Sequence, residues 1–378
     1  MSNGSRARAW AEIDLAALRA NFQVVRERAA TAKGVLPMVK ANAYGLGVEA
    51  VVDALEPLDP WGYGVATVAE GRALRALDVS RPILVATPIP PGEEDAAVDA
   101  ELTAGVSDLD ALRRLAAAAQ ESGATVDFHV DVDTGMGRSG FPADDVASWA
   151  PALLDAAGPL RCTGAYTHFH SADEGDGRAP TDEQVRRFEA ALAALPVARA
   201  QLVVHVANSA AAVRWPELAF DLVRPGIFLY GGRIAPAGSG APEPRPVVSI
   251  HARLSHVRDV PPGTTAGYGA TYAAAKAERW GTAAIGYGDG LSRALAKGGG
   301  ALVGGRRVPM RGRISMDSVV LDVSGVPGVQ AGDVATFVGA DGGESIALED
   351  VAAAMGTISY EVLTRMGERL ERVYLDEA

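Results

Sequence analysis

The sequence has 378 residues but only one cysteine, Cys162, together with six histidines. A single cysteine cannot form a disulfide within the chain, and so few sulfur ligands exclude a cysteine-rich zinc site. We therefore expect no metal centre of that kind. A chain without disulfides also suits a reducing compartment.

The sequence also has fewer positively charged residues than negatively charged ones. The chain has 35 Lys and Arg residues against 47 Asp and Glu residues, which gives a formal net charge of -12 and a pI of about 5.0. Nucleic-acid binders and proteins held on anionic membranes are normally basic, so neither class fits. No apolar run is long enough to cross a bilayer, and the N-terminal stretch "MSNGSRARAWAEIDL" lacks the apolar core of a signal peptide. We expect a soluble, cytoplasmic protein.

The first part of the chain alternates short apolar, β-branched runs with helical patterns, and it has no Gly-rich dinucleotide turn. Such alternation predicts parallel strands joined by crossover helices, and eight units fit a (β/α)8 TIM-like barrel. An open doubly wound sheet is the alternative, which the count of eight and the missing Gly-rich turn disfavour. The expected strands are Val35–Lys40, Tyr63–Thr67, Pro82–Thr87, Leu102–Ser107, Thr125–Asp133, Cys162–Phe169, Gln201–Asn208 and Val223–Tyr230.

A Gly/Pro-rich stretch, Gly231–Pro246, interrupts this alternation. Beyond it, runs such as "VVSIHARLSHVRDV" and "DVATFVGA" predict antiparallel strands joined by turns. We therefore expect an α/β barrel over residues 1–240, followed by a mostly β domain over residues 241–378. The extreme N-terminal strand is expected to be able to pack with this second domain.

Five of the eight expected strands carry a polar residue or a glycine where they end, and in a barrel these ends form the active face. Each such residue alone has an ordinary explanation, since a lysine at a strand end is usually solvated. Their recurrence at five strands favours one shared site. The residues are Lys40, Arg138, His168, Asn208, Ser209, Arg224 and Gly226.

The residue types in this set indicate a particular chemistry. A lysine in a tight, partly apolar pocket has a lowered pKa and can form a Schiff base. A phosphate site built from the loops after strands seven and eight recurs in barrels, and Ser209 and Gly226 stand in those loops. A Schiff-base lysine beside a phosphate cradle points to pyridoxal 5'-phosphate.

Nine motifs then resemble one known family in their order along nearly the whole chain. They are "VKANAYGLG", "DTGMGRSGF", "THFHSADE", "HVANSAA", "VRPGIFLYG", "GYGATY", "IGYGDG", "GRISMD" and "ISYE". The sequence resembles the alanine racemases, pyridoxal-phosphate enzymes with a barrel and a C-terminal β domain. Nine ordered motifs are far more specific than any one of them.

The resemblance implies a role for each matching residue. Lys40 resembles the lysine that holds the cofactor and also acts as one catalytic base, and Tyr268 resembles a second base on the opposite face of the substrate. Asp317 falls in the motif "GRISMD", next to Met316, and is expected to support the site from outside. The other cofactor-binding residues are expected to be Tyr44, His168, Asn208, Ser209, Arg224, Gly226, Ile227 and Tyr360.

Arg138, Tyr287 and Met316 resemble residues on the substrate side, and His205 resembles the residue that holds Arg224. In the family, Tyr268, Tyr287 and Met316 come from the partner subunit, so the resemblance implies a head-to-tail homodimer with shared active sites. Five positions depart from the family pattern: Leu46, Asp131, His170, Ser315 and Ser359. Asp131 stands where many members carry a lysine that braces Arg138, and Ser315 stands where cysteine is common.

The reaction expected from the resemblance is the interconversion of L-alanine and D-alanine. A racemase of serine, lysine or ornithine remains an alternative, because an apolar pocket wall discriminates only modestly between similar side chains. A fold-related amino-acid decarboxylase is a further alternative. Such enzymes usually have a glycine-triplet phosphate loop, whereas the triplet here, Gly298–Gly300, lies outside the expected barrel.

Overall fold

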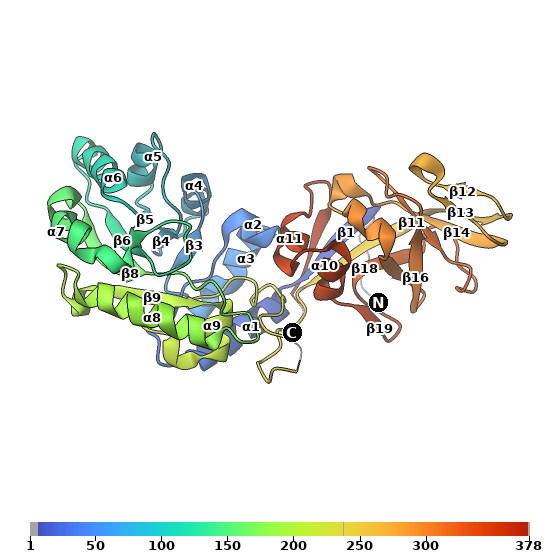
Figure 1. The fold of residues 1–378 in the computed structure, drawn as a ribbon. Helices are drawn as coiled ribbons and strands as arrows, with labels where there is room; N and C mark the ends of the chain where they lie inside the picture. The colour runs from blue at the N-terminus through green and yellow to red at the C-terminus, as the bar shows by residue number, and fades with distance from the viewer. Residues whose placement is uncertain (1–6, 237, 377–378) are drawn as a thin grey trace.

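The computed structural model describes residues 7–236 and 238–376. Figure 1 shows two lobes along one axis, an α/β lobe and a β-rich lobe, with α11 (Ser359–Thr364) of the second packed near α2 (Lys40–Tyr44) of the first. Within the described residues, no helix has the length and apolarity needed to cross a bilayer.

The first lobe is built on eight parallel strands. In sheet order they are β2 (Gly34–Val35), β10 (Leu222–Arg224), β9 (Val203–Asn208), β8 (Arg161–Tyr166), β6 (Asp127–Asp133), β5 (Thr103–Val106), β4 (Ile83–Val85) and β3 (Tyr63–Val65). A parallel bridge between Met38, just after β2, and Gly64 of β3 joins the two ends of this sheet. The backbone N–H of Val39 also donates to the Gly64 carbonyl at 2.8 Å. The prediction of an eight-stranded barrel is confirmed.

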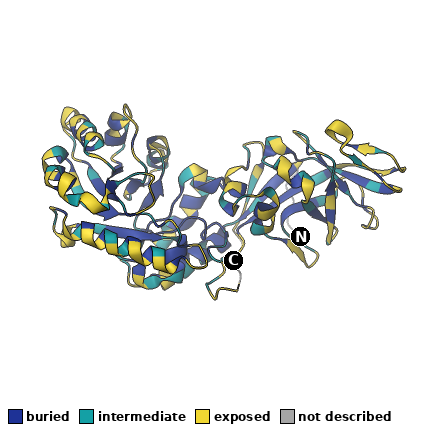
Figure 2. Cartoon of the chain, in the orientation of Figure 1, coloured by how far each residue is buried: buried dark blue, intermediate teal, exposed yellow. Residues whose placement is uncertain are grey.

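Helices cover the outside of this barrel, with buried faces toward the strands and exposed faces outward (Figure 2). Local sequence explains where they begin, as in α4, where Thr67 and Glu70 form a reciprocal capping box. In α6, Leu112, Leu115 and Ala119 recur at helical spacing and are buried. The helices are α1 (Leu15–Arg28), α2, α3 (Val48–Leu55), α4 (Val68–Ala76), α5 (Glu94–Asp99), α6 (Leu109–Ser122), α7 (Val146–Ala157), α8 (Arg178–Ala193) and α9 (Ser209–Arg214).

The second lobe is mostly antiparallel sheet, as expected. Its strands run β19 (Glu344–Ile346), β18 (Val334–Asp341), β15 (Gly300–Val303), β16 (Arg306–Arg311), β17 (Val319–Asp322), β14 (Glu278–Ala283), β11 (Val248–Val260), β1 (Ala9–Asp14) and β20 (Glu371–Leu375). A further pairing of β18 with β11 closes the strands between them into a ring. Short elements complete the chain: β7 (Phe141–Pro142), β12 (Thr265–Ala266), β13 (Tyr272–Ala273) and α10 (Leu348–Met355).

The first strand of the chain belongs to this second lobe. β1 pairs antiparallel with β11 and parallel with β20, and only then does the chain enter α1 and the barrel. The N-terminal strand therefore lies in the sheet of the second lobe, and the helix that follows it belongs to the barrel, so this segment connects the two lobes.

All eight expected strands are shorter in the structure, and the first and the last of them differ most. Lys40 begins the short helix α2 and does not end a strand. The strand expected over Val223–Tyr230 ends at Arg224, because Pro225 cannot donate to the ladder and the next residues form successive turns. Both differences lie at the cavity described below, where chain direction changes abruptly.

Candidate active site

A cavity of about 250 Å³ opens at the carboxyl ends of the barrel strands, and Tyr360 and Thr364 of α11 add to its wall. Ten residues expected from the sequence line it together. They are Lys40, Tyr44, Arg138, His168, Asn208, Ser209, Arg224, Gly226, Ile227 and Tyr360.

Lys40 enters the cavity from an unusual backbone turn. Ala41, Asn42, Ala43 and Tyr44 all have φ between 52° and 56°, so the turn is left-handed. This conformation costs roughly 1–2 kcal/mol for each residue with a side chain, and such strain is typical of functional sites. Hydrogen bonds hold the turn: Ala41 N–H donates to Glu70 Oε1 at 2.6 Å, and Val48 N–H donates to Asn42 Oδ1 at 2.8 Å. The turn places Lys40 and Tyr44 at the same cavity.

The environment of Lys40 favours its neutral amine. Burial lowers the pKa of the ammonium group most, and the positive charge of Arg138 lowers it further, while Glu70 acts in the opposite direction. A lysine with a lowered pKa is a better nucleophile and a better base near neutral pH. The structure thus gives Lys40 the properties that a Schiff-base lysine needs.

Two tyrosine hydroxyls and Ser209 converge on the far side of the cavity. Neither Tyr44 nor Tyr360 bonds another protein group through its hydroxyl within the described residues, and their rings lie 6.0 Å apart. Burial raises the pKa of both tyrosines, so both stay protonated and can donate. A side chain at Gly226 would overlap the Tyr44 hydroxyl, so glycine is required there. Three hydroxyls beside a bare backbone suit a phosphate group.

Arg224 is a buried cation whose two terminal nitrogens form hydrogen bonds with protein groups. NH1 donates to His205 Nδ1 at 2.9 Å and to the His205 carbonyl at 2.6 Å, while NH2 donates to the Thr167 carbonyl at 2.8 Å and lies 3.3 Å from His168 Nδ1. No carboxylate within the described residues forms an ion pair with it. Burial lowers the pKa of Arg224 to about 10, so it remains charged at neutral pH. Its Nε–H is the donor left for a group in the cavity.

His168 lies beside Arg224 as a neutral ring. Burial lowers the pKa of His168 to about 3, with further contributions from Arg224, Arg138 and Lys40. Burial and the nearby positive charges of Arg224 and Arg138 together disfavour a protonated imidazole. His168 is therefore a neutral ring that can pack or accept a hydrogen bond.

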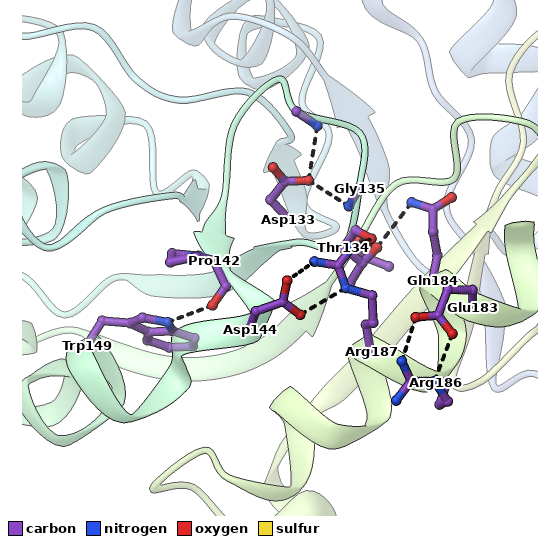
Figure 3. A network of polar contacts seen from close by, with 12 residues as sticks. Asp133, Thr134, Gly135, Pro142, Asp144, Trp149, Glu183, Gln184, Arg186 and Arg187 are labelled. Atoms are coloured by element: carbon purple, nitrogen blue, oxygen red, sulfur yellow. Dashed lines mark hydrogen bonds and ion pairs between the residues drawn. The ribbon is translucent and has the colours of Figure 1, made fainter.

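The loop that carries Arg138 is anchored at its base (Figure 3). Asp133 accepts hydrogen bonds from the backbone N–H groups of Gly135 and Gly137, at 2.9 and 3.0 Å. Arg187 of α8 donates to the Thr134 carbonyl at 2.7 Å and pairs with Asp144. The loop base is thus fixed, whereas the Arg138 side chain is exposed at the cavity.

Asp131 does not contact Arg138 directly in this structure. Its Oδ2 accepts from the hydroxyls of Ser107 and Ser139, at 3.0 and 2.9 Å, and no ion pair or hydrogen bond between Asp131 and Arg138 occurs in the described part of the chain. Burial raises the pKa of Asp131, partly offset by these two hydroxyls. The short carboxylate therefore bonds Ser139, the neighbour of Arg138 on this loop, but does not reach Arg138 itself.

Four expected residues lie outside this cavity, in the second lobe. Tyr268, Tyr287 and Met316 are 69%, 39% and 51% exposed. Asp317 pairs with Arg369 at 2.9 Å. The backbone N–H of Tyr287 donates to the Ser315 carbonyl at 3.0 Å, which brings Tyr287 close to Met316.

Tyr268 belongs to the same region. The glycines on either side of it, Gly267 and Gly269, pack against Arg313, which lies just before Ser315 and Met316 in sequence. We call Tyr268, Tyr287, Arg313 and Met316 the tyrosine patch. It is an exposed patch with large apolar surface, a feature typical of interaction sites.

Sequence reasoning missed several residues that line the cavity, above all Tyr166. Its ring stacks on His205 with centroids 5.1 Å apart and an interplanar angle of 8°, and the Arg224 guanidinium lies 5.4 Å from its centre. A signal was available, because Tyr166 lies two residues before His168 in the expected strand Cys162–Phe169, where alternate side chains share one face. The other missed residues are Met38, Ala41, Val65, Ala86, Thr87 and Thr364.

The cavity suits an organic cofactor more than a metal ion. Across the described residues, no group of three His, Cys, Asp or Glu side chains could hold a metal. The cavity instead offers an amine, a cation with one free donor, and three hydroxyls around a glycine. This donor set matches the aldehyde, ring nitrogen and phosphate of pyridoxal 5'-phosphate.

Comparisons with known proteins agree with this geometry. The family model described as alanine racemase, N-terminal domain, matches residues 13–234, and the model for the C-terminal domain matches residues 247–374. An alanine racemase of Citrifermentans bemidjiense is 40% identical over 371 residues, covering 96% of this chain and 98% of that protein.

Solved structures extend the likeness to the whole fold. The alanine racemase of Bacillus anthracis, solved with bound L-Ala-P, has a TM-score of 0.90 and 31% identity, covering 98% of this chain and 96% of that one. The alanine racemase of Bartonella henselae, with covalently bound pyridoxal phosphate, has a TM-score of 0.88 and 27% identity, covering 98% and 100%.

Proposed function

Because the chain belongs to the alanine racemase family, we propose that it interconverts L-alanine and D-alanine, using pyridoxal 5'-phosphate held in the barrel cavity. It is an isomerase, as the resemblance implied. The observation that carries the cofactor assignment is the meeting of Lys40, Arg224 and the Tyr44–Tyr360 hydroxyls in one cavity. When bound, pyridoxal 5'-phosphate supplies an electron sink that eases loss of the α-proton.

Each wall of the cavity has its own part in binding. Lys40 would hold the cofactor through its amine, and its lowered pKa keeps enough of that amine neutral to react. The hydroxyls of Tyr44, Tyr360 and Ser209 would donate to the phosphate. Arg224 would donate its Nε–H to the ring nitrogen, and because arginine keeps its proton, it would not protonate that nitrogen.

This choice of partner limits the chemistry. With Arg224 as its partner, the cofactor would supply a weaker electron sink than one with a protonated ring nitrogen. That would favour prompt return of the α-proton over slower side reactions such as transamination. Arg224 therefore suits racemisation better than reactions that need a long-lived carbanion.

Racemisation also needs a proton donor and acceptor on each face of the substrate. Lys40 serves one face from within the barrel. The cavity has no second suitable base of its own, because Tyr166 is buried with a strongly raised pKa and His168 is held neutral with a pKa of about 3. We assign the second face to Tyr268, supplied by a partner subunit.

A head-to-tail homodimer would bring this tyrosine to the cavity. In the single chain the tyrosine patch is exposed and lies in the lobe that does not form the cavity floor. Two chains arranged head to tail would each cover the other's patch with a barrel mouth, as expected for a two-fold interface. Met316 and Tyr287 would then limit the space for the substrate side chain beside Arg138.

Three alternatives are separated by one experiment. Purified protein with pyridoxal 5'-phosphate is incubated with L-alanine, L-serine, L-lysine or L-ornithine in deuterated buffer. NMR follows α-proton exchange, and chiral chromatography measures the enantiomers. We expect deuterated D-alanine to form far faster than any other product. Faster exchange of another amino acid would change the substrate, and carbon dioxide release would indicate a decarboxylase instead.

A further inference from the structure

A row of buried polar side chains crosses the barrel interior below the cavity. His129 of β6 lies 2.8 Å from His205 of β9, measured from Nδ1 to Nε2, and His205 Nδ1 lies 2.9 Å from Arg224 NH1 of β10. His129 and His205 are at most 1% exposed, and Arg224 is 5% exposed. The row therefore begins at a histidine that has no place in the cavity wall and ends at the cation in that wall.

The direction of hydrogen bonding along this row is fixed by Arg224. A guanidinium can only donate, so His205 Nδ1 must be an unprotonated acceptor. Burial and the Arg224 charge hold the pKa of His205 well below its usual value, so the ring is neutral and its one proton sits on Nε2. That proton needs an acceptor, and His129 Nδ1 is the atom within hydrogen-bond distance.

His129 must then carry its own proton on Nε2. Burial lowers the pKa of His129 to about 3, so the ring is neutral and its Nδ1 is free to accept. The opposite arrangement, in which His129 donates to His205, would put a proton on His205 Nδ1. The Nδ1–H of His205 and an N–H of Arg224 would then face each other without an acceptor. Unpaired buried donors beside a buried charge destabilise the folded protein.

The barrel is shaped to hold these rings in place. A side chain at Gly164 of β8 would meet the His129 ring at 2.5 Å, so glycine makes room for that ring. Tyr166 stacks on His205, and a side chain at Gly105 would overlap the Tyr166 hydroxyl. Barrel interiors are usually filled by bulky apolar residues, and here two glycines admit a polar row instead.

We propose that His129 is a positioning residue that holds the His205 proton on Nε2 and so keeps Arg224 aimed at the cavity. The consequence for catalysis rests on the proposed function, because it concerns the group that Arg224 faces. The hydrogen-bond direction itself rests only on the row of three side chains. A shift of the His205 proton to Nδ1 would displace Arg224 NH1 and turn its Nε–H away from the cofactor ring.

The test is nitrogen NMR of the histidine rings in full-length protein labelled with 15N-histidine, with and without pyridoxal 5'-phosphate. Substitution of each histidine in turn assigns the spectra. We expect His205 to show an unprotonated Nδ1 and a protonated Nε2, unchanged between pH 6 and 9 with or without the cofactor. A protonated Nδ1 at His205 in the wild-type protein would overturn the inference, whatever reaction the enzyme performs.

Two substitutions of His129 sharpen the test. His129→Asn keeps an acceptor oxygen close to the position of Nδ1, whereas His129→Leu removes the acceptor and keeps an apolar side chain. We expect His129→Leu to move the His205 proton toward Nδ1, to weaken cofactor binding about tenfold and to shift the visible absorbance band of the bound cofactor. His129→Asn should retain the wild-type tautomer and band.

The outcomes separate the two proposals. Equal behaviour of the Leu and Asn variants, with the His205 tautomer unchanged in both, would show that His129 only fills space. An unchanged wild-type tautomer together with absent racemisation would leave the positioning row intact and remove the proposed function alone. Should His129→Leu fail to fold, the wild-type spectrum and His129→Asn still decide the question.

Discussion

The barrel cavity and the tyrosine patch differ in how their side chains are held. Arg224 in the cavity has hydrogen bonds to four protein acceptors, and His168, His205 and Tyr166 pack around it. Tyr268 in the patch is 69% exposed, and no hydrogen bond of its hydroxyl occurs in the described part of the chain. A fixed cavity with one base and an exposed tyrosine elsewhere are what the proposed shared site requires.

Strain follows the same division. The left-handed turn after Lys40 stores roughly 1–2 kcal/mol at each residue and is held by Glu70 and Asn42 within the chain. In the patch, Gly267 and Gly269 adopt positive φ without that cost, and Ala270, at φ 47°, is a single strained residue against four in a row in the barrel turn. The barrel, together with Tyr360 of α11, therefore supplies the proposed cofactor-binding residues within one chain, whereas the proposed shared site needs the β-lobe residues of a second chain.

The largest expected effect comes from removing the barrel's base. Lys40→Ala should lower racemisation by roughly 10⁴-fold or more, because one residue both holds the cofactor and moves the proton. The visible absorbance of lysine-linked cofactor should vanish from the spectrum. Lys33→Ala is the matched control, since Lys33 pairs with Asp221 on the surface at 2.9 Å. A retained absorbance band in Lys40→Ala would contradict the assignment.

Removing the patch's base should be the next largest effect. Tyr268→Phe should slow kcat by roughly 10²–10⁴-fold, the usual contribution of one acid/base group, while cofactor absorbance stays as in the wild type. Exchange of the α-proton should be lost far more from one enantiomer than from the other. The control is Tyr272→Phe, because the Tyr272 hydroxyl already donates to Glu278 within its own lobe. Equal, slight slowing of both enantiomers would remove Tyr268 from the opposite face.

Substitutions at the phosphate site should have a smaller effect than those at the two bases. They should not alter the tyrosine patch. Tyr44→Phe and Tyr360→Phe should each weaken pyridoxal 5'-phosphate binding by roughly tenfold, because each removes one donor to a charged group. Fluorescence titration of cofactor-free protein measures this. Tyr374→Phe, which loses a bond to the Leu46 carbonyl outside the cavity, should bind as the wild type does. Unchanged binding in both cavity variants would place the phosphate elsewhere.

A further effect, on stability and not on activity, separates the two lobes by their stability in acid. His129 and His168 have folded pKa values of about 3, below the ordinary value of 6.5, so the unfolded chain binds protons that the folded barrel does not. The contribution of these two rings to the free energy of unfolding is fully present above about pH 6.5. It falls by about 1.4 kcal/mol per pH unit for each ring as the pH drops toward 3.

Denaturant unfolding between pH 7 and 4 checks this slope. His129→Asn should flatten the dependence of the unfolding free energy on pH by about one proton relative to the wild type. His256→Asn, which removes an exposed histidine of the β lobe, is the control. An equal change in the two variants would show that burial in the barrel does not govern acid sensitivity.

Much of the barrel and its cavity could be predicted from sequence, for identifiable reasons. Alternating apolar strands and helical patterns gave the eight strands, and polar residues at strand ends marked Lys40, His168, Ser209 and Arg224. The left-handed turn could not be foreseen, because Ala41 and Ala43 disfavour that conformation in isolation. It exists because Glu70, distant in sequence, holds it.

The contacts among the buried side chains of the site could not be predicted from the sequence either. Tyr166 can stack on His205 because Gly105, on another strand, has no side chain that would overlap the Tyr166 hydroxyl. The His129 ring likewise fits because Gly164 has no side chain. Such pairings require the register of strands, which the pattern of residues does not fix. Likewise, the departure at Asp131 left the bracing of Arg138 open, and in the structure Ser107 and Ser139 are the hydrogen-bond partners of Asp131. The roles of Tyr268, Tyr287 and Met316 stay predictions, since they concern a second chain.

The most direct measurement mixes two inactive proteins. Lys40→Ala chains and Tyr268→Phe chains are denatured together, refolded with pyridoxal 5'-phosphate and assayed for alanine racemisation. If each site combines the barrel of one chain with the tyrosine of the other, a mixed dimer holds one intact site. Random pairing should then restore about a quarter of wild-type activity. No restoration, with mixed dimers shown to be present, would mean that each chain builds its site alone and would contradict the account.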